Sequence, residues 1–417
     1  MPNVSSYIRI EDNSTPVVVL VSSQHGGLGV IRSLGRAGIP VYGIHEHSWE
    51  PAARSRFLRK VFCWNFLTSP AADSVTFLMD VANTISRRPI LIPTSDITAL
   101  FLAENARSLA ENFIFSTASV DVVRNFSSKV QTSDLCGEMG IPTAATAKPQ
   151  SREDVLNFAQ MSRFPVIVKG EYGEFLRKRG ERVRVATISG KEELLAIFDL
   201  NTGATPFPIV LQEYIPGGDD TVWMFNGYFN GRSECLFGAT GRKLRQFPPH
   251  RGSTSLGICE KSEVVELQTA RLLRGVGYCG PVDMGYRYDV RDDQYKLLDV
   301  NPRVGSTFRL FVASNGLDVV RALYLDLSGQ TVPPAQVCQG RKWIVESNDL
   351  VSSWAAFRER QLTFRGWLRS LRGVQEGVWL AWSDLVPLMT LPLLWLRKRL
   401  RKRTLRVASG VIKDLAG

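Results

Sequence analysis

Three side chains between Gly280 and Ser306 carry oxygens that could hold a hard cation. Asp283 lies in one segment of alternating apolar residues, and Asp299 and Asn301 lie two residues apart in a second one. Side chains two positions apart on a strand point to the same face, so Asp299 and Asn301 are expected to share a face. Two carboxylates and an amide oxygen suit a Mg²⁺ ion that nucleotide phosphates also coordinate. The stretch therefore predicts a hairpin with a magnesium–nucleotide site.

The first 125 residues have the pattern of an α/β domain. Strands are expected at 17–21, 41–44 and 89–93, and helices at 30–37 and 96–102. Gly26, Gly27 and Gly29 predict a glycine turn at the start of the first helix, where backbone N–H groups could receive an anion. These glycines do not complete a dinucleotide-binding fingerprint, and the second strand lacks a clear acidic ribose ligand at its end. A nicotinamide nucleotide site is therefore not favoured.

Helical and strand patterns alternate through the middle of the chain. Helices are expected at 130–139, 151–161, 189–200, 263–276 and 309–314, and strands at 164–169, 183–185, 208–215, 222–228 and 234–239. The last two strands need a hairpin turn, for which Asn226-Gly227 and Asn230-Gly231 are both suitable. The charges of both signs in Glu171–Arg184 are typical of a mobile loop between strands.

The chemistry-bearing residues of this region follow one another in a characteristic order. Lys129 precedes a helix, Lys169 closes a strand, and Gln212–Ile215 precedes two acidic residues and then the Asp283, Asp299 and Asn301 set. This order resembles the ATP-grasp superfamily over roughly residues 17 to 329, with the motifs strongest between 120 and 310. Within the superfamily, segments 242–253 and 299–303 resemble the carboxylate–amine ligases, a group that includes the D-aspartate ligases.

The resemblance implies a fold and a division of the chain. It implies an α/β protein with a Rossmann-like pre-ATP-grasp domain at 1–125 and a two-lobed α+β ATP-grasp domain at 126–335. The small lobe would cover about 126–205 and the large lobe about 206–335. A mostly helical, basic and apolar C-terminal tail would occupy 336–417.

The resemblance also implies roles for the residues of a MgATP site. The two lysines would contact phosphates, the backbone between the lobes would pair with the adenine edge, and an acidic side chain would bond the ribose hydroxyls. The implied ATP-binding residues are Lys129, Lys169, Gln212, Glu213, Tyr214, Ile215, Asp219 and Asp220, and the implied metal ligands are Asp283, Asp299 and Asn301. Related proteins often have glutamate where Asp299 stands, so one or two Mg²⁺ ions are expected.

The reaction implied by the resemblance joins a carboxylate to an amine. The carboxylate attacks the γ-phosphate of ATP to give an acyl phosphate, and an amine then displaces phosphate to give an amide. Arg303 and Lys169 are the expected catalytic residues, and Arg303 would contact the acyl phosphate or the substrate carboxylate. Weaker candidates for holding a substrate carboxylate are Arg245, Arg251, Ser253 and Ser306, and His250 is a weak candidate for the base.

Two other functions stay open on the sequence. An ATP-grasp enzyme of different outcome would carboxylate its substrate or transfer phosphate, and a nucleotide-binding scaffold would bind ATP without turnover. The retained lysines and the complete ligand set argue against a scaffold. The substrates are expected to be a small carboxylate and a small amine, with amino acids among the candidates.

The charge is concentrated at the C-terminus. Of the formal net charge of +11, residues 365–417 contribute +8, from eleven Lys and Arg against three acidic residues. The body is therefore nearly neutral, which argues against a nucleic-acid partner. The six cysteines have no repeated spacing and are expected to be buried thiols in a reducing compartment, and residues 1–16 do not resemble a secretory signal, so a cytoplasmic protein is expected.

The tail contains a second feature of interest. Residues 377–396 have Asp384 as their one charged side chain and include three tryptophans, and six of the seven residues 397–403 are Lys or Arg. The length matches the roughly 20 residues that span a bilayer, but two prolines and a central aspartate disfavour a span. The sequence leaves open a surface attachment to an anionic membrane through 377–406, at the inner face of the membrane, and helices packed on the body or on a second subunit.

Overall fold

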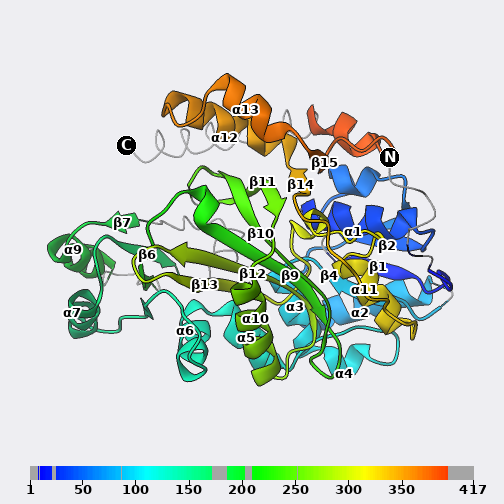
Figure 1. Cartoon of the computed structure of the whole chain (residues 1–417). Coiled ribbons are helices and arrows are strands. Elements are labelled where there is room, and N and C mark those ends of the chain that lie inside the picture. Colours follow the sequence, from blue (N-terminus) through cyan, green and yellow to red (C-terminus); the bar gives the residue numbers. More distant parts are fainter. Residues whose placement is uncertain are drawn as a thin grey trace, which may run out of the picture.

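The computed structural model describes residues 8, 10–20, 25–85, 87–170, 186–201, 209–250 and 252–392. Within these ranges the strands form three sheets, and Figure 1 shows helices packed around them in an α/β molecule. The predicted loop at 171–184, the predicted strand at 183–185 and Arg251 lie outside the described residues. In the part of the chain that is described, no helix is long and apolar enough to cross a membrane.

The first sheet is parallel, with the strand order β3-β2-β1-β4. Its elements are β1 (Val17–Leu20), α1 (His25–Arg36), β2 (Val41–His45), β3 (Leu58–Cys63), α2 (Ala71–Asn83), β4 (Ile90–Pro93), α3 (Asp96–Glu104) and α4 (Ala106–Leu109). Val17 and Val19 pack in the cluster that contains α1, whereas Val18 and Leu20 pack with α2 and α3. Both faces of the sheet are thus covered, as the short apolar strands predict.

Two sequence predictions for this region need correction. The edge strand β3 was not predicted, because Arg59 and Lys60 interrupt its apolar pattern. Helix α1 begins at His25, so the glycines lie inside the helix and not in a turn before it. Glycine is needed at position 29 because the helix packs closely there: a Cβ on Gly29 would lie 2.8 Å from the ring of Phe308.

The second sheet is antiparallel, with the order β5-β8-β6-β7. Its elements are β5 (Thr146–Ala147), α7 (Arg152–Met161), β6 (Val166–Gly170), β7 (Ala186–Ile188), α9 (Lys191–Asn201) and β8 (Ile209–Glu213), preceded by α5 (Val120–Ser127) and α6 (Lys129–Glu138). Val166 and Val168 pack against α7 and α9. Because neighbours on a strand point to opposite faces, Lys169 points away from these helices.

The third sheet is the largest and has the order β13-β12-β9-β10-β11-β14-β15. Its elements are β9 (Val222–Phe229), β10 (Cys235–Phe247), β11 (Ser253–Cys259), α10 (Glu263–Gly275), β12 (Gly280–Asp289), β13 (Gln294–Asn301), α11 (Val319–Leu327), β14 (Lys342–Ile344) and β15 (Val374–Gly377). The β9–β10 turn is formed by Asn230-Gly231, while Asn226-Gly227 lie inside β9. Of the two turns that the sequence allowed, the structure therefore has the second.

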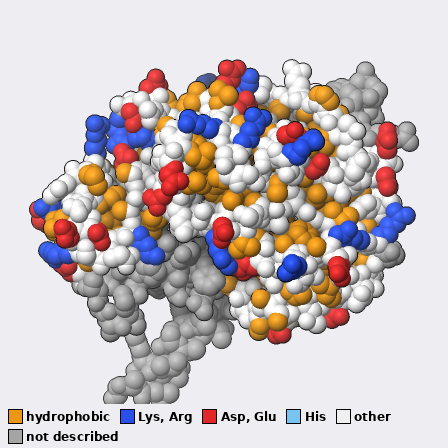
Figure 2. Space-filling view, turned by 90° about the horizontal axis from the view of Figure 1, so that it is seen from below, with side chains coloured by type: hydrophobic (Ala, Val, Ile, Leu, Met, Phe, Trp, Pro, Cys, Tyr) orange, Lys and Arg blue, Asp and Glu red, His pale blue; other side chains and the backbone are white. Residues whose placement is uncertain are grey.

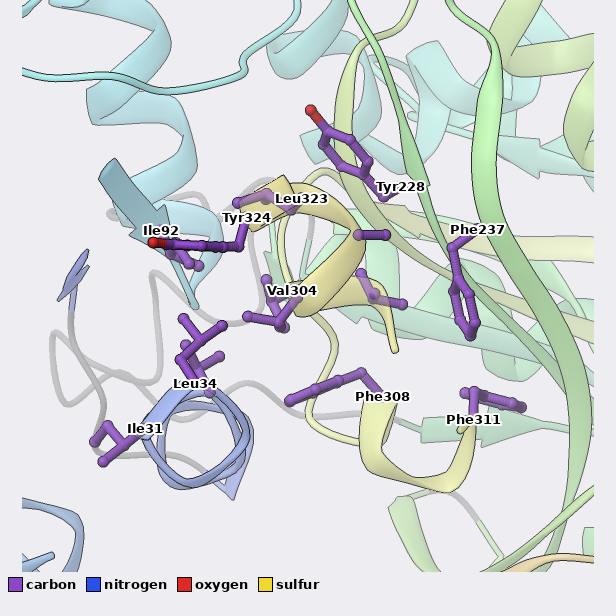
Figure 3. Close-up of a cluster of buried hydrophobic side chains, with 14 of the residues drawn as sticks. Ile31, Leu34, Ile92, Tyr228, Phe237, Val304, Phe308, Phe311, Leu323 and Tyr324 are labelled. Carbon is purple, nitrogen blue, oxygen red and sulfur yellow. The ribbon is translucent and has the colours of Figure 1, made fainter. Parts of the chain in front are cut away.

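One core joins the first and third sheets. Met224 and Tyr228 on β9 share a buried cluster with α1, α11 and the segment after β13. Figure 3 shows Phe308, Phe311 and Leu323 between α1 and the strands of the third sheet. The helix predicted at 309–314 is wrong: a single 3-10 turn spans Phe308–Leu310, and the chain then becomes extended at Phe311. The four aromatic and aliphatic residues 308, 310, 311 and 313 are buried in this core, which sets the local backbone.

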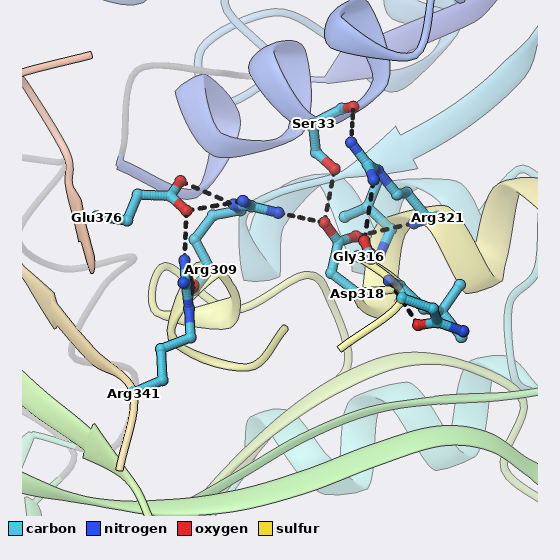
Figure 4. Close-up of polar contacts among 10 residues, drawn as sticks. Ser33, Arg309, Gly316, Asp318, Arg321, Arg341 and Glu376 are labelled. Carbon is cyan, nitrogen blue, oxygen red and sulfur yellow. Dashed lines mark hydrogen bonds and ion pairs between the residues drawn. The ribbon is translucent and has the colours of Figure 1, made fainter. Parts of the chain in front are cut away.

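The C-terminal segments complete the third sheet. Strand β15 pairs in parallel with β14, and between them lie α12 (Glu346–Arg358) and α13 (Phe364–Leu371). Glu376 on β15 accepts hydrogen bonds from Arg309 at 2.9 and 2.7 Å and from Arg341 at 2.6 Å. Figure 4 shows how Arg309 also reaches Asp318, which in turn accepts from Ser33 of α1.

The segment after β15 is packed on the first domain through Asp384. Its carboxylate is buried and accepts from Arg32 Nε at 2.9 Å, from Ser55 Oγ at 2.7 Å and from the Arg56 backbone N–H at 3.0 Å. Of the two alternatives for residues 377–396, packing on the body therefore holds for residues 377–384. Asp384, which the sequence placed centrally in a membrane-associated segment, faces protein.

The cysteines are free thiols, as expected, but they are not all buried. Cys136 and Cys259 are buried, whereas Cys63, Cys235 and Cys338 are exposed. The spacing of the cysteines in the sequence carried no information on which thiols are buried.

Candidate active site

The hairpin of β12 and β13 brings the three predicted metal ligands together. Asp283 pairs directly with Asn301, and Gly285 pairs with Asp299. A Cβ on Gly285 would lie 2.2 Å from Asp299 Oδ1, so the glycine leaves room for that carboxylate. Asn301 donates from Nδ2 to the backbone oxygen of Asp283 at 3.0 Å, which orients its amide group. The oxygens of the three side chains are thus gathered at the end of the hairpin.

Basic side chains surround these carboxylates. Lys129, the first residue of α6, has its Nζ 3.7 Å from Asp299 Oδ2. Arg303 places Nη1 3.2 Å from Asp283 Oδ2 and Nε 3.0 Å from Asp96 Oδ1. The first, second and third sheets all contribute to this arrangement through the elements that carry these residues.

The pKa values of the two carboxylates are shifted in opposite directions. Burial raises the pKa of Asp283 above its ordinary value, and Arg303 offsets only part of that rise. Burial would also raise the pKa of Asp299, but the positive charges of Lys129, Lys243, Lys169 and Arg303 outweigh it and lower the pKa. Asp299 is therefore an anion held among cations.

Lys169 lies in the same region on the second sheet. Its Nζ donates to Gln212 Oε1 at 2.6 Å, and Gln212 donates from Nε2 to Thr146 Oγ1 at 3.0 Å. Burial, together with the nearby charge of Lys129, lowers the pKa of Lys169 to about 7. An ammonium group in this position would be stabilised by an added anion.

The predicted linker, Gln212–Ile215, begins in β8, which lies between β5 and β6 in the second sheet. Glu213 accepts from Arg291 Nη2 at 2.6 Å and so ties the linker to the turn of the β12–β13 hairpin. Ile215 is buried and Tyr214 is half-buried. The side chains of Gln212 and Glu213 are both used in contacts within the protein.

The two acidic residues after the linker have different surroundings. Asp219 accepts from the backbone N–H and from Nε2 of Gln246, at 3.0 and 2.9 Å. Asp220 is exposed. The structure thus separates two residues that the sequence could not rank.

Sequence reasoning missed two residues of the site. Lys243 on β10 donates to Gly252 O at 2.9 Å, and its ammonium interacts electrostatically with Asp299, Asp283 and Asp219. Asn226 on β9 donates to Asp283 Oδ1 at 2.9 Å. Its Oδ1 is buried and has no hydrogen-bond partner among the described residues. Lys243 was missed because it lies among several basic residues in the sequence. Asn226 was missed because Asn226-Gly227 was interpreted as a possible hairpin turn.

The weaker substrate candidates do not gather at this site. Arg245 is buried, and its guanidinium donates to both oxygens of Asp349 at 2.7 and 3.0 Å and to Ser370. This arginine holds α12, so its predicted contact with substrate is not supported. Ser253 is exposed and donates to Phe247 O at 3.3 Å. His250 faces Glu359 of α12, with Nε2 2.9 Å from Oε2, so its predicted role as a base is not supported either.

Ser306 has a different position. It follows Gly305 in the segment on which α1 packs, and a Cβ on Gly26 would lie 3.2 Å from the Ser306 Cα. A Cβ on Gly305 would lie 2.6 Å from the Asp283 carboxyl carbon. Ser306 is therefore placed where the start of α1 meets the carboxylate cluster.

The fold and the site define a class of protein. The chain has the ATP-grasp fold, as its motifs predicted. Staphylococcus aureus N5-carboxyaminoimidazole synthetase superposes with a TM-score of 0.59 at 12% identity, covering 79% of this chain and 80% of that one. An L-amino acid ligase from Bacillus licheniformis superposes with a TM-score of 0.56 at 13% identity, covering 78% of each chain.

A curated relative gives the narrower likeness. A D-aspartate ligase from Enterococcus faecium is 25% identical over 250 residues, which are 57% of this chain and 58% of that protein. The predicted resemblance to the carboxylate–amine ligases is thereby confirmed. The chain spans less than two thirds of the length of this relative. No protein-family model matches the chain.

Proposed function

We propose that the protein is an ATP-dependent carboxylate–amine ligase that forms an amide through an acyl phosphate. The observation that carries the proposal is the meeting of Asp283, Asp299 and Asn301 with Lys129 and Arg303 within about one side-chain length, at distances of 3.2 to 3.7 Å between charged atoms. Anionic metal ligands beside basic residues suit a metal–triphosphate complex. The names of the relatives, a D-aspartate ligase and an L-amino acid ligase, favour amino acids as substrates.

The nucleotide would lie between the second and third sheets. Lys129, Lys169 and Lys243 supply positive charge for its phosphates, and the backbone of residues 212–215 would pair with the adenine edge. We assign the ribose hydroxyls to Asp220, because both oxygens of Asp219 already accept from Gln246.

The ligand set fits Mg²⁺ in complex with a nucleotide. Among the described residues, no group of three or more His, Cys, Asp and Glu side chains could hold a metal by themselves. Asp283, Asp299 and Asn301 therefore need phosphate oxygens to complete an octahedral shell. When bound, Mg²⁺ would supply charge neutralisation at the phosphates. Asp299 has a short side chain beside Lys129, which favours one firmly held ion over two.

The reaction needs positioning and charge more than it needs acid–base groups. A carboxylate oxygen of the first substrate attacks the γ-phosphorus, and the bond to the β–γ bridging oxygen breaks to release ADP. The amine nitrogen of the second substrate then attacks the acyl carbon, phosphate leaves, and the nitrogen loses a proton. Arg303, held by Asp96 and Asp283, can stabilise charge on the transferred phosphoryl group. Ser306 is placed to orient the substrate.

The domain division is part of the proposal. We place the pre-ATP-grasp domain at 1–125, the small lobe at about 126–205, the large lobe at about 206–335 and the tail at 336–417. The tail was predicted to be mostly helical, but it also contains β14 and β15, which extend the sheet of the large lobe. The proposed use of ATP and the six free thiols support a place in the cytoplasm. A place at the inner face of a membrane is a separate part of the proposal and does not follow from them.

Hydroxamate trapping separates ligation from the alternatives. A ligase would give an acyl hydroxamate when hydroxylamine replaces the amine, with stoichiometric ADP. A carboxylating enzyme would release ADP only with bicarbonate, and a scaffold would bind MgATP without releasing ADP. A screen of amino acids and small acids, taken in pairs, identifies the substrates first.

The metal assignment has its own test. Asp299→Ala combined with Asn301→Ala is expected to abolish ADP release and to lower MgATP affinity at least tenfold, because two of the three protein ligands are lost. The matched control is Asp292→Asn, in the exposed turn of the same hairpin. Circular dichroism checks the fold. Undiminished MgATP binding by the folded double variant would refute the metal assignment.

A further inference from the structure

Helix α12 has an unusual distribution of polar and apolar side chains. It buries Asp349, Ser352 and Ser353 against the body, while Leu350 and Trp354 are 58% and 66% exposed. The buried polar groups are satisfied, since Asp349 binds Arg245 and Ser352 Oγ donates to Gln246 O at 2.6 Å. A surface helix normally has the opposite arrangement. Its apolar side is thus directed away from the protein to which it is attached.

The neighbouring segments continue this apolar surface. On α13, Phe364 and Leu368 are 63% and 47% exposed, and after β15 the same holds for Trp382 and Met389 at 84% and 72%. Trp367 packs α13 on α12 through Phe357 and donates to Asp349.

The start of α12 also contacts the segment after β15. Glu346 accepts from the backbone N–H groups of Trp379 and Leu380. Figure 1 places α12, α13 and this last segment on one side of the molecule. We call this surface, residues 350–372 and 380–389, the tail face.

The charged residues of the tail face are mostly arginines. Five arginines between α12 and the end of α13 are exposed: Arg358, Arg360, Arg365, Arg369 and Arg372. The exposed acid in this range, Glu359, is paired with His250. Asp384, the acidic residue of the following segment, is buried against Arg32.

The opposite side of the molecule is different. Figure 2 shows it from below, with Lys and Arg interspersed with Asp and Glu. Helix α10 on that side also has exposed apolar residues, Val264 and Leu267, but they accompany Glu263 and Glu266. The exposed apolar side chains of the tail face, in contrast to those of α10, lie among mostly basic residues.

We infer that the tail face binds the surface of an anionic lipid bilayer. Exposed aromatic and aliphatic side chains would enter the interface between headgroups and acyl chains, and the arginines would meet lipid phosphates. The sequence continues from this face into residues 397–403, where six of seven are Lys or Arg, which adds charge of the same sign.

A second copy of the chain fits the face less well. In a two-fold dimer the same surface meets itself, so the five exposed arginines of each copy would oppose those of the other without intervening acids. Like charges at such an interface are unfavourable. The tail face includes none of the residues assigned to the proposed ligase site, and the inference does not depend on the proposed ligase reaction.

Vesicle co-sedimentation of the full chain tests the inference. The protein is expected to bind vesicles that contain about 30% phosphatidylglycerol in phosphatidylcholine, and not to bind pure phosphatidylcholine, at about 0.1 M salt. Leu350→Ser with Trp354→Ser, and separately Arg365→Glu with Arg369→Glu, are expected to lower partitioning about tenfold or more. The matched controls on the other side, Val264→Ser with Leu267→Ser and Arg107→Glu with Arg232→Glu, should bind as the unchanged protein does.

The outcomes are distinct. Retained MgATP binding shows that the face variants are folded, so their loss of binding supports the inference. Failure of the unchanged protein to bind anionic vesicles would overturn it. Equal binding by all variants would also overturn it, because the basic run at 397–403 would then act alone. A dimer that dissociates in the face variants, without vesicle binding, would assign the face to a second copy.

Discussion

Lys169 is a residue of the site whose charge state responds strongly to its surroundings. Burial comes first among the causes that lower its pKa to about 7, and the charge of Lys129 adds to it. The phosphates of ATP would return the pKa toward the ordinary value for lysine, because an anion stabilises the ammonium form. Nucleotide binding should therefore be linked to protonation of Lys169.

This linkage predicts a pH dependence of binding. Between pH 7 and the ordinary lysine value of 10.5, the free protein has largely lost the proton that the complex retains, so MgATP affinity should fall as pH rises above 7. Calorimetric titration at pH 7.5, in two buffers with different ionisation enthalpies, should show uptake of a fraction of a proton. The contribution of Lys169 to stability has the opposite sign: the unfolded chain binds more protons over this range, so stability of the free protein rises with pH.

Lys169→Arg tests whether Lys169 itself takes up the proton when MgATP binds. Arginine stays charged throughout the range, so the variant should bind MgATP without the proton uptake. The exposed Lys191→Arg in α9 serves as the control and should leave the uptake unchanged. Identical proton uptake in Lys169→Arg would show that another group titrates.

The site residues that the sequence predicted were those fixed by local pattern. Asp283, Asp299 and Asn301 lie on two adjacent strands, so short-range periodicity indicated that they share a face. Lys169, in β6, was predicted from the resemblance to the ATP-grasp superfamily. Lys243, Asn226 and the commitment of Arg245 to α12 depend on pairings between strands and helices far apart in the chain. No single-sequence pattern contains those pairings.

At the scale of elements, a buried ion pair helps to attach α12 to the third sheet. Arg245 on β10 binds both oxygens of Asp349, and the side chains are 10% and 1% exposed. The pair is the reason that α12 can lie on the sheet with its polar side inward. Breaking it from one side leaves a buried charge without its counter-ion, which is more costly than replacing both partners.

Asp349→Ala is therefore expected to lower the local free energy of unfolding of α12 by about 3 to 5 kcal/mol. Arg245→Met combined with Asp349→Leu should recover most of that loss, because two apolar groups replace the pair. Hydrogen exchange of the α12 amides measures both variants. Glu359→Ala, which removes the exposed partner of His250, is the control and should change the value by less than about 0.5 kcal/mol.

The prediction of elements succeeded where patterns were regular and failed where tertiary contacts decided. Helix α7 has a Ser151 capping box and strand β6 has an apolar run, and both were predicted within two residues. The extended course after Phe308 was predicted as a helix, because spacing alone does not show that the segment lies between α1 and the third sheet. The prediction of a mostly helical tail likewise could not show which side of α12 is buried.

At the scale of the whole molecule, the C-terminal segment joins the parts that carry the site. Glu376 is bound by Arg309 and Arg341, and its pKa is about 2 because these charges outweigh the effect of burial, which alone would raise it. Asp384 is bound by Arg32 of α1, whose first turn lies against Gly305 and Ser306. The tail thus holds the first domain against the large sheet, and it also presents the tail face.

Asp384→Ala tests whether the Arg32–Asp384 ion pair holds the segment after β15 on the first domain. The substitution leaves Arg32, which is 4% exposed, without its carboxylate, and it removes the acceptor of Ser55. The expected cost of about 3 to 5 kcal/mol should raise exchange rates of the amides in residues 378–392 by a factor of about 10² or more. Ser383→Ala, next in sequence and exposed, removes a single hydrogen bond from Arg36 and should have little effect.

The same variant tests whether the Arg32–Asp384 ion pair also positions side chains of the tail face. If Trp382 and Met389 are positioned by Asp384, Asp384→Ala should weaken binding to anionic vesicles, and circular dichroism checks that the variant is folded. Slow exchange of 378–392 in the folded variant would show that the neighbouring strand β15 holds the segment without the ion pair. In that case vesicle binding should also be unchanged, because the apolar side chains would keep their place.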